Sequence, residues 1–247
     1  MKKALIPLAL ATTLTPLHAA LVYTEDFTVG SSSSAGDIGW QFHVGSSASD
    51  QSTRIASSGN DTGVNSDLDR FQVKGNNSGV GSANQFLLST AEPGAVHTVA
   101  DISTVSSTVG LYRVGFSSSD VTFRIAIQVD GNWFLSDTAE TLTPAGVTNN
   151  YDNSKTTTLT VDFASESWNT LLFTPTTTLT NSNTTALPQP TATSAVTQYG
   201  VYIEQASTAA NWIGVDDFQI NTVSVPEPGS SSLIGLAGCA LLLRKRS

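Results

Sequence analysis

The strongest structural constraint in this chain is a run of alternating apolar residues over residues 121–135. A period of two places successive side chains on opposite faces of a strand, and an Asp-Gly pair between two such runs is a preferred hairpin turn. The segment therefore predicts an antiparallel β-hairpin with one face turned towards a core. The apolar positions are Val121, Phe123, Ile125, Ile127, Val129, Trp133 and Leu135, and Asp130-Gly131 separates the two arms.

Similar short runs recur along the chain, separated by clusters of Gly, Ser, Asn and Asp. Between the two chain ends, no long stretch repeats its apolar residues at helical spacing. About ten such strands predict an all-β domain of two packed antiparallel sheets, either a jelly-roll or a lectin-like sandwich. Residues 45–69 and 174–193 are expected to form long loops. The other predicted strands cover residues 21–27, 40–44, 85–89, 96–102, 111–116, 158–163, 168–173, 196–203 and 212–220.

The first nineteen residues are typical of a secretion signal. Lys2 and Lys3 precede an apolar stretch over residues 4–17, and the small residues Ala19 and Ala20 follow it. This order predicts a signal helix over residues 1–19 that signal peptidase removes after Ala19. An uncleaved membrane anchor is the alternative.

The C-terminus, residues 225–247, has three parts in a fixed order: a proline-containing motif, an uncharged apolar stretch over residues 229–243, and a basic cluster. Fifteen helical residues cover about 22 Å, against a hydrocarbon core of about 30 Å, so this helix is a marginal membrane span. The basic cluster should stay cytoplasmic, which places the preceding chain outside the inner membrane. The motif is Val225-Pro226-Glu227-Pro228, and the cluster is Arg244-Lys245-Arg246.

These three parts resemble the PEP-CTERM sorting signal of exosortase substrates. The resemblance covers residues 225–246. It implies that a membrane-embedded, transpeptidase-like exosortase cuts near the proline motif and passes residues 20–224 outward, to the cell surface or the extracellular matrix. It also implies a transient intermediate in the inner membrane. The alternative is an ordinary short anchor behind a proline-containing linker.

Residues 20–224 have the size of one β-sandwich domain. They hold six basic and 19 acidic residues, a net charge of −13 with histidine neutral. That charge argues against nucleic acid and anionic surfaces as partners and leaves neutral glycans and divalent cations compatible. The only cysteine, Cys239, lies in the tail, so no disulfide framework is expected in the domain.

Acidic residues near both ends of the domain suggest a calcium site. Glu25 and Asp26 lie on the first predicted strand and Asp216 on the last, and first and last strands are often neighbours in jelly rolls. Carboxylate oxygens suit calcium, with backbone carbonyls and water completing its shell. Residues 23–27 (YTEDF) and 212–220 (WIGVDDFQI) are similar to the ends of jelly-roll carbohydrate-binding modules. The resemblance implies a structural Ca²⁺ bound by one acidic residue from each end.

The sequence gives little support to catalysis. The domain holds only two histidines, His43 and His97, and it has neither a Gly-x-Ser-x-Gly elbow nor a cysteine nucleophile. Trp133, after the hairpin turn, and Trp212, which opens the last strand, could instead stack on sugar rings. Tryptophans in sandwiches are more often core residues.

These features predict an exported surface or matrix protein that is not an enzyme and is sorted by an exosortase. The alternative function is a carbohydrate-binding, lectin-like module that contacts extracellular polysaccharide, and a polysaccharide-active enzyme is a further alternative.

Overall fold

The computed structural model describes residues 20–27, 38–45, 52–56, 70–74, 84–91, 94, 97–113, 120–144, 155–173, 179–182, 187–205 and 212–223. The predicted signal at 1–19 and the predicted sorting tail at 225–247 both lie outside these ranges. Over the described ranges, no helix is long and apolar enough to cross a membrane.

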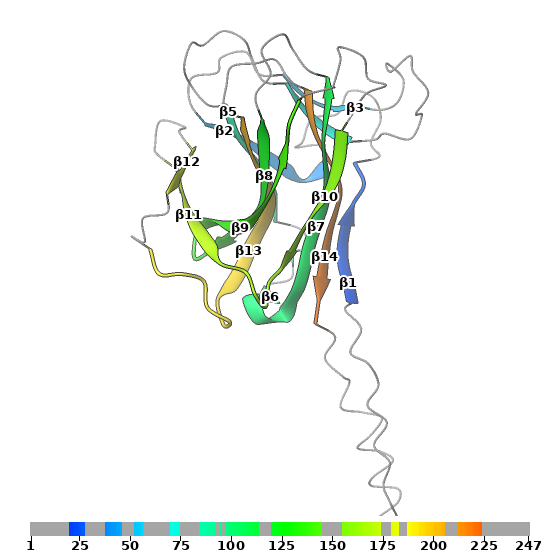
Figure 1. The fold of residues 1–247 in the computed structure, drawn as a ribbon. Coiled ribbons are helices and arrows are strands. Elements are labelled where there is room, and N and C mark those ends of the chain that lie inside the picture. Colours follow the sequence, from blue (N-terminus) through cyan, green and yellow to red (C-terminus); the bar gives the residue numbers. More distant parts are fainter. Residues whose placement is uncertain are drawn as a thin grey trace, which may run out of the picture.

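Two antiparallel sheets pack face to face, which confirms the predicted all-β sandwich (Figure 1). The smaller sheet has six strands in the order β10-β7-β14-β4-β3, with β1 also paired to β14. These strands are β1 (Ala20–Glu25), β3 (Ser52–Ala56), β4 (Arg70–Lys74), β7 (Ile102–Arg113), β10 (Lys155–Asp162) and β14 (Trp212–Thr222).

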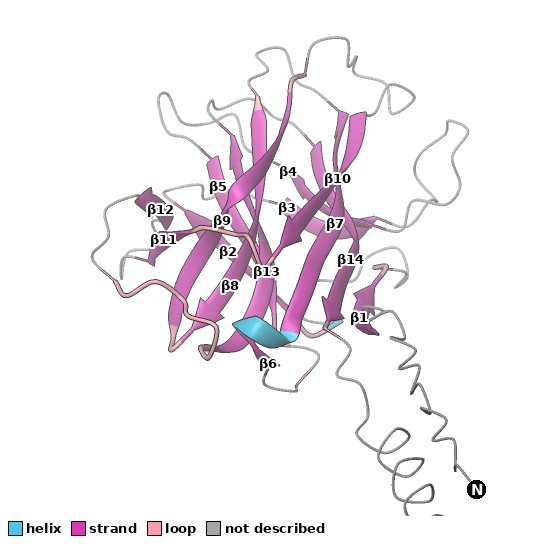
Figure 2. Ribbon diagram, turned by 60° about the horizontal axis from the view of Figure 1, so that its bottom comes forward, coloured by secondary structure: helices cyan, strands magenta, loops and turns pink. Residues whose placement is uncertain are grey.

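The larger sheet has eight strands in the order β12-β11-β9-β8-β13-β5-β2, with β6 also paired to β13. A short 3₁₀ turn, η3 (Val99–Asp101), joins β6 to β7 at one end of the sandwich (Figure 2). The strands are β2 (Trp40–Gly45), β5 (Asn84–Thr90), β6 (His97–Thr98), β8 (Val121–Val129), β9 (Asn132–Leu142), β11 (Trp168–Phe173), β12 (Leu179–Ser182) and β13 (Ala195–Gln205).

The first and last strands of the domain are neighbours. β14 pairs with β7 along one edge, while β4 and β1 share its other edge. At the end of the β1–β14 ladder, Ala20 lies opposite Thr222. The two ends of the domain therefore lie side by side.

The main core fills the space between the sheets. Alternate residues of each strand enter it, as in β8, where Val121, Phe123, Ile125 and Ile127 are fully buried. Burying one such side chain contributes about 1.5–3 kcal/mol, so the alternation that marks the hairpin in the sequence also stabilises the sandwich.

A second apolar cluster covers the opposite face of the eight-stranded sheet. Cα atoms of its two edge strands, β2 and β12, approach within 8 Å of each other, so the sheet curls until its edges meet. The curl encloses the face that points away from the six-stranded sheet. This cluster consists of Leu87, Ala126, Trp133, Leu135, Leu171 and Tyr202, all of them buried.

The strand predictions were wrong in several places: β4 was not predicted, and β7 was predicted only from residue 111 onward. β3 lies within the loop expected at 45–69, and β12 within the loop expected at 174–193. Both strands are short and sit at sheet edges, and their sequences, STRIA and LTNS, are too brief for an alternation to stand out. The strand expected at 96–102 is instead β6 followed by η3, and β7 begins at Ile102.

Candidate ligand-binding site

The predicted calcium ligands lie where β1 meets β14. Glu25 pairs with Phe218, which brings Asp26 to the neighbourhood of Asp216. The Glu25 carboxylate is already engaged within its own strand. Its Oε1 accepts the Phe27 backbone N–H at 2.9 Å, and its Oε2 accepts the Tyr23 hydroxyl at 3.3 Å.

Asp216 is the most perturbed carboxyl group of this junction. It is 9% exposed, and its Oδ1 accepts the backbone N–H of Asp217 at 2.8 Å. Burial raises its pKa to about 7, the negative charges of Asp217 and Asp26 add to the rise, and the Asp217 N–H and the charge of Arg70 oppose it. Burial, more than neighbouring charge, therefore makes the ionised form of Asp216 costly.

The fit of calcium to this junction rests on the buried carboxyl of Asp216 beside Asp26. A cation there would stabilise the ionised carboxylate, and oxygen donors are the ligands calcium prefers. Within the described ranges, no three Asp, Glu, His or Cys side chains come together, so backbone carbonyls and water would complete the shell. Arg70 already supplies one fixed positive charge, since it is fully buried and lowers the pKa of Asp216.

The two tryptophans predicted to contact sugars lie in different settings. Trp133 belongs to the second apolar cluster and is 6% exposed, so it offers little ring face to a ligand. Trp212 opens β14, and its side chain lies outside what the structure describes.

The two histidines of the predicted domain lie apart, and His43 contacts a serine. His43 Nε2 lies 3.4 Å from Ser89 Oγ, which donates to Gln198 Oε1 at 3.4 Å. Burial lowers the pKa of His43. His97 lies on β6, in a different part of the sheet.

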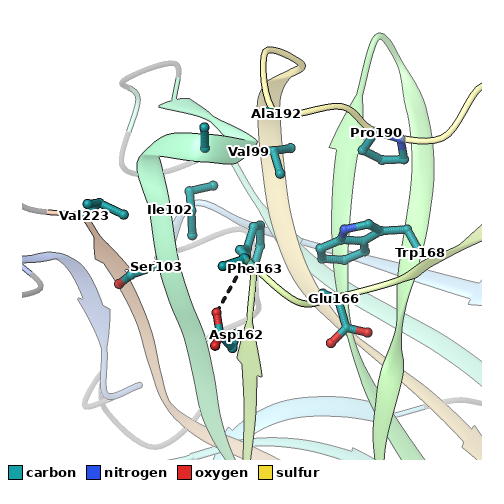
Figure 3. A pocket seen from close by; sticks show the side chains of 12 residues that line it. Val99, Ile102, Ser103, Asp162, Phe163, Glu166, Trp168, Pro190, Ala192 and Val223 are labelled. Atoms are coloured by element: carbon teal, nitrogen blue, oxygen red, sulfur yellow. Dashed lines mark hydrogen bonds between the residues drawn. The ribbon is translucent and has the colours of Figure 1, made fainter.

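A pocket of about 460 Å³ lies at the end of the sandwich where β1 begins and β14 ends; Figure 3 shows its lining side chains. We name it the chain-end pocket. Sequence reasoning did not find it. Its walls come from η3, the start of β7, the β10–β11 turn, the segment before β13 and the end of β14. The lining residues are Val99, Ala100, Ile102, Ser103, Asp162, Phe163, Ala164, Glu166, Trp168, Pro190, Ala192 and Val223.

An aromatic pair forms the apolar part of the pocket. Trp168 meets Phe163 edge to face, with ring centroids 5.0 Å apart and an interplanar angle of 66°. Pro190 lies across from the indole of Trp168 (Figure 3). Trp168 is only 8% exposed, so it presents an edge of its ring to the pocket and anchors the wall with the rest.

Two carboxylates flank this aromatic pair, and hydrogen bonds to the backbone hold both. Asp162 Oδ1 accepts the N–H of Ala164 at 3.0 Å, which fixes the turn after β10. Glu166 Oε1 accepts the N–H of Thr138 at 2.9 Å, which ties the turn to β9. Each carboxylate keeps a second oxygen that can accept a hydrogen bond from a ligand.

The remaining walls are fixed by backbone hydrogen bonds between distant segments. The N–H of Val99 donates to the Ser194 carbonyl at 2.9 Å, and the N–H of Val223 donates to the Asp101 carbonyl at 2.8 Å. Among the residues described as lining it, the charged side chains are Asp162 and Glu166 alone. The pocket can therefore accept hydrogen bonds beside an aromatic edge, and it would repel anions.

The acidic-aromatic stretch D-F-A-S-E-S-W over residues 162–168 was the available sequence signal for this pocket. It was divided between two predicted strands, and only the structure shows that its turn faces Pro190 and Val223.

No family model matches this chain, and no curated protein matches it. Three solved structures resemble it in outline. The CBM22-1 xylan-binding domain of Xyn10C from Paenibacillus barcinonensis is 13% identical with a TM-score of 0.42, covering 86% of this chain and 100% of that domain. The family 11 carbohydrate-binding module from Clostridium thermocellum is 13% identical with a TM-score of 0.42, covering 86% and 99%. The K2 cleaved adhesin domain of Lys-gingipain is 15% identical with a TM-score of 0.41, covering 80% and 96%. Likenesses of this size identify neither a family nor a ligand for this chain.

Proposed function

We propose that this protein is an exported, non-enzymatic surface or matrix protein that an exosortase sorts by its C-terminal tail. The observation that carries the proposal is the pairing of Ala20 with Thr222 at the end of the β1–β14 ladder. The residue after the predicted signal-peptidase cut and a residue three before the predicted sorting motif are thus neighbours. Neighbouring domain ends would let a signal and a tail enter the same membrane without either having to cross the folded domain.

Sorting is tested by replacing Pro226, Glu227 and Pro228 together with alanine and locating residues 20–224 in the producing cell. The proposal expects the variant to remain in the inner membrane with its tail uncut, while the wild-type domain is released. A matched variant, with Pro188 replaced by alanine in the domain, should be sorted as the wild type is. Unchanged release of the motif variant would disprove exosortase sorting.

A second proposed function, favoured by the chain-end pocket, is the binding of a neutral saccharide of extracellular polysaccharide. Sugar hydroxyls donate to carboxylates, and the C–H groups of a pyranose can contact Pro190 and the exposed edge of Trp168, without stacking on a ring face. The only charged side chains described in the pocket are acidic, so an uncharged sugar fits it better than an acidic one.

Isosteric variants test saccharide binding with little change to the fold. Asp162→Asn and Glu166→Gln keep the amide-accepting oxygen of each side chain and remove its charge. A charge-assisted hydrogen bond contributes about 1.5–3 kcal/mol, so either variant should weaken binding on a glycan array by tenfold or more. Glu140→Gln, on β9 and outside the pocket, is the matched control. Wild-type protein that binds no glycan would refute this function.

The absence of catalysis belongs to the same proposal. Asp162 and Glu166 each accept a backbone N–H, and among the described residues no histidine, cysteine or lysine lines the pocket beside them. We also propose that a structural Ca²⁺ sits beside Asp26 and Asp216, with backbone carbonyls and water completing its shell because Glu25 is engaged elsewhere, and that it holds the end of β1 against β14. Hydrolysis of a polysaccharide by the purified domain, lost in Glu166→Gln, would replace the binding role with an enzymatic one.

A further inference from the structure

The chain-end pocket and the exit of the sorting tail share one end of the sandwich. Val223, which lines the pocket, is the last residue before the short linker to the sorting motif. η3 and the lower ends of β1 and β14 lie together at this end (Figure 2). Any membrane that holds the tail is therefore close to the pocket.

Exposed apolar side chains gather around this exit. Three large apolar side chains of the described residues are exposed, and two of them, Leu21 at 57% and Val223 at 39%, flank the point where the chain leaves. Leu21 pairs with Asn221, so Leu21 and Val223 project from the same side of the β1–β14 ladder. We name Ala100, Pro190, Ala192 and Val223, which all line the pocket, the exit face; Leu21 lies beside it on β1.

The tail holds the exit face close to the bilayer. Residues 224–228 separate Val223 from the apolar stretch that begins at Gly229. Fully extended, the six steps from Val223 to Gly229 span about 20 Å. The headgroup layer on each side of a bilayer takes up about 5–8 Å of that reach. The exit face thus lies within about 15 Å of the headgroups for as long as the tail is inserted.

We propose that the exit face lies against the membrane surface in the tail-anchored precursor, so that large ligands reach the chain-end pocket only after the tail is cut. The inference rests on the proposed sorting function. It adds that cleavage of the tail determines when large ligands can reach the pocket. A polysaccharide chain in the periplasm would then be excluded from the precursor, and the released domain would bind it outside.

The chemistry of the exit face fits an uncharged, zwitterionic lipid surface. Asp101, Asp162 and Glu166 lie beside it and would be repelled by anionic lipids. The exit face has few large apolar side chains and would not bind a membrane by itself. The inserted tail attaches the protein to the membrane, and the exit face can then lie against the lipid headgroups without repulsion. The free domain should accordingly not bind phosphatidylcholine vesicles.

Cysteine labelling tests the proposal without knowledge of the ligand. Cys239 is first replaced by alanine, which leaves a chain without cysteine. Ala192→Cys then places a thiol at the pocket rim, and Thr141→Cys places one at the exposed far end of β9 as the matched control. The full chain in phosphatidylcholine proteoliposomes is compared with released residues 20–224. The reagents are N-ethylmaleimide and a long polyethylene glycol maleimide.

The proposal expects the long reagent to label Ala192→Cys severalfold more slowly in proteoliposomes than in the released domain. Thr141→Cys should react at one rate in both, and N-ethylmaleimide should react with both thiols in both settings. A flexible Gly/Ser insert between Ser224 and Val225 should restore labelling by the long reagent. Equal labelling of the two thiols in proteoliposomes would overturn the inference, whatever the sorting experiment gives. A sorting failure with unequal labelling would instead remove the exosortase role and leave the membrane-facing pocket.

Discussion

Replacing Asp216 by asparagine should stabilise the domain at pH 8 when calcium is removed by EDTA. The carboxyl is 9% exposed, and burial raises its pKa from 3.8 to about 7. A raised acid pKa means that the unfolded chain gives up its proton first. This group therefore costs no stability below about pH 4, costs progressively more up to about pH 7, and costs a constant amount above it.

The size of the effect follows from the pKa. A change from 3.8 to about 7 corresponds to at most about 4 kcal/mol, at 1.36 kcal/mol per pH unit. For a domain of this length that is at most about 8–16 °C in melting temperature. The difference between Asp216→Asn and the wild type should vanish near pH 4 and reach its full value at pH 8.

Calcium should reverse this order of stability. If Ca²⁺ binds at the β1–β14 junction, it neutralises the Asp216 carboxylate and stabilises the wild type, while Asp216→Asn gains little. Thermal melting of both proteins at pH 8, in EDTA and in excess Ca²⁺, measures the four stabilities. If calcium does not raise the melting temperature of the wild type, the proposed calcium site is refuted. An Asp216→Asn protein that melts below the wild type in EDTA would refute the burial argument, and would indicate that Arg70 neutralises Asp216 more fully than its raised pKa implies.

Five further variants, at Gly200, Gly131, His43 and Trp168, test close packing, a turn, a buried histidine and the pocket wall. Gly200→Ala should lower the free energy of unfolding in urea by about 1–3 kcal/mol or more, because its Cβ would collide with the Leu88 backbone carbonyl. Gly131→Ala should lower it by about 1–2 kcal/mol, because its Cβ meets open space but its backbone is left-handed. Burial lowers the pKa of His43, so the wild type should lose stability as pH falls below about 6.5. His43→Gln should lack this pH dependence. Urea unfolding midpoints of the two proteins at several pH values measure the difference. Trp168→Ala should cost about 3–5 kcal/mol by removing its contact with Phe163, whereas Trp168→Phe should cost less, as thermal melting would show.

Sequence periodicity predicted the fold where burial decides which residue stands at each position. The hairpin of β8 and β9 is confirmed with its Asp130-Gly131 turn, both residues with positive φ, because every second side chain of β8 enters the core. β7 was only partly predicted. Its inward positions include Ser107, fully buried, which donates to the Asp216 carbonyl at 2.8 Å. A buried serine at an inward position interrupts the apolar alternation from which a strand is predicted, although the strand itself continues through it.

The site was harder to predict because it depends on which turns meet. The pairing of first and last strands, on which the calcium prediction depended, is present, and it follows from a general tendency of jelly rolls. The chain-end pocket joins four separate stretches, from Val99 to Val223, and no local spacing contains that information. Local sequence marks the turn at Asp162 and Glu166, but not the partner that closes it.

The curl of the eight-stranded sheet explains why a pocket at the end of the sandwich is the better place for a ligand. A flat or gently curved sheet would offer its outer face as a platform, with Trp133 and Tyr202 as exposed rings. Here β2 and β12 meet, and Leu87 and Tyr202 are fully buried on that face. Those side chains stabilise the curled sheet through their own burial, and opening the face to a sugar would sacrifice that contribution. At the end of the sandwich, backbone hydrogen bonds already fix the walls around Trp168, so a ligand could enter without disrupting a core.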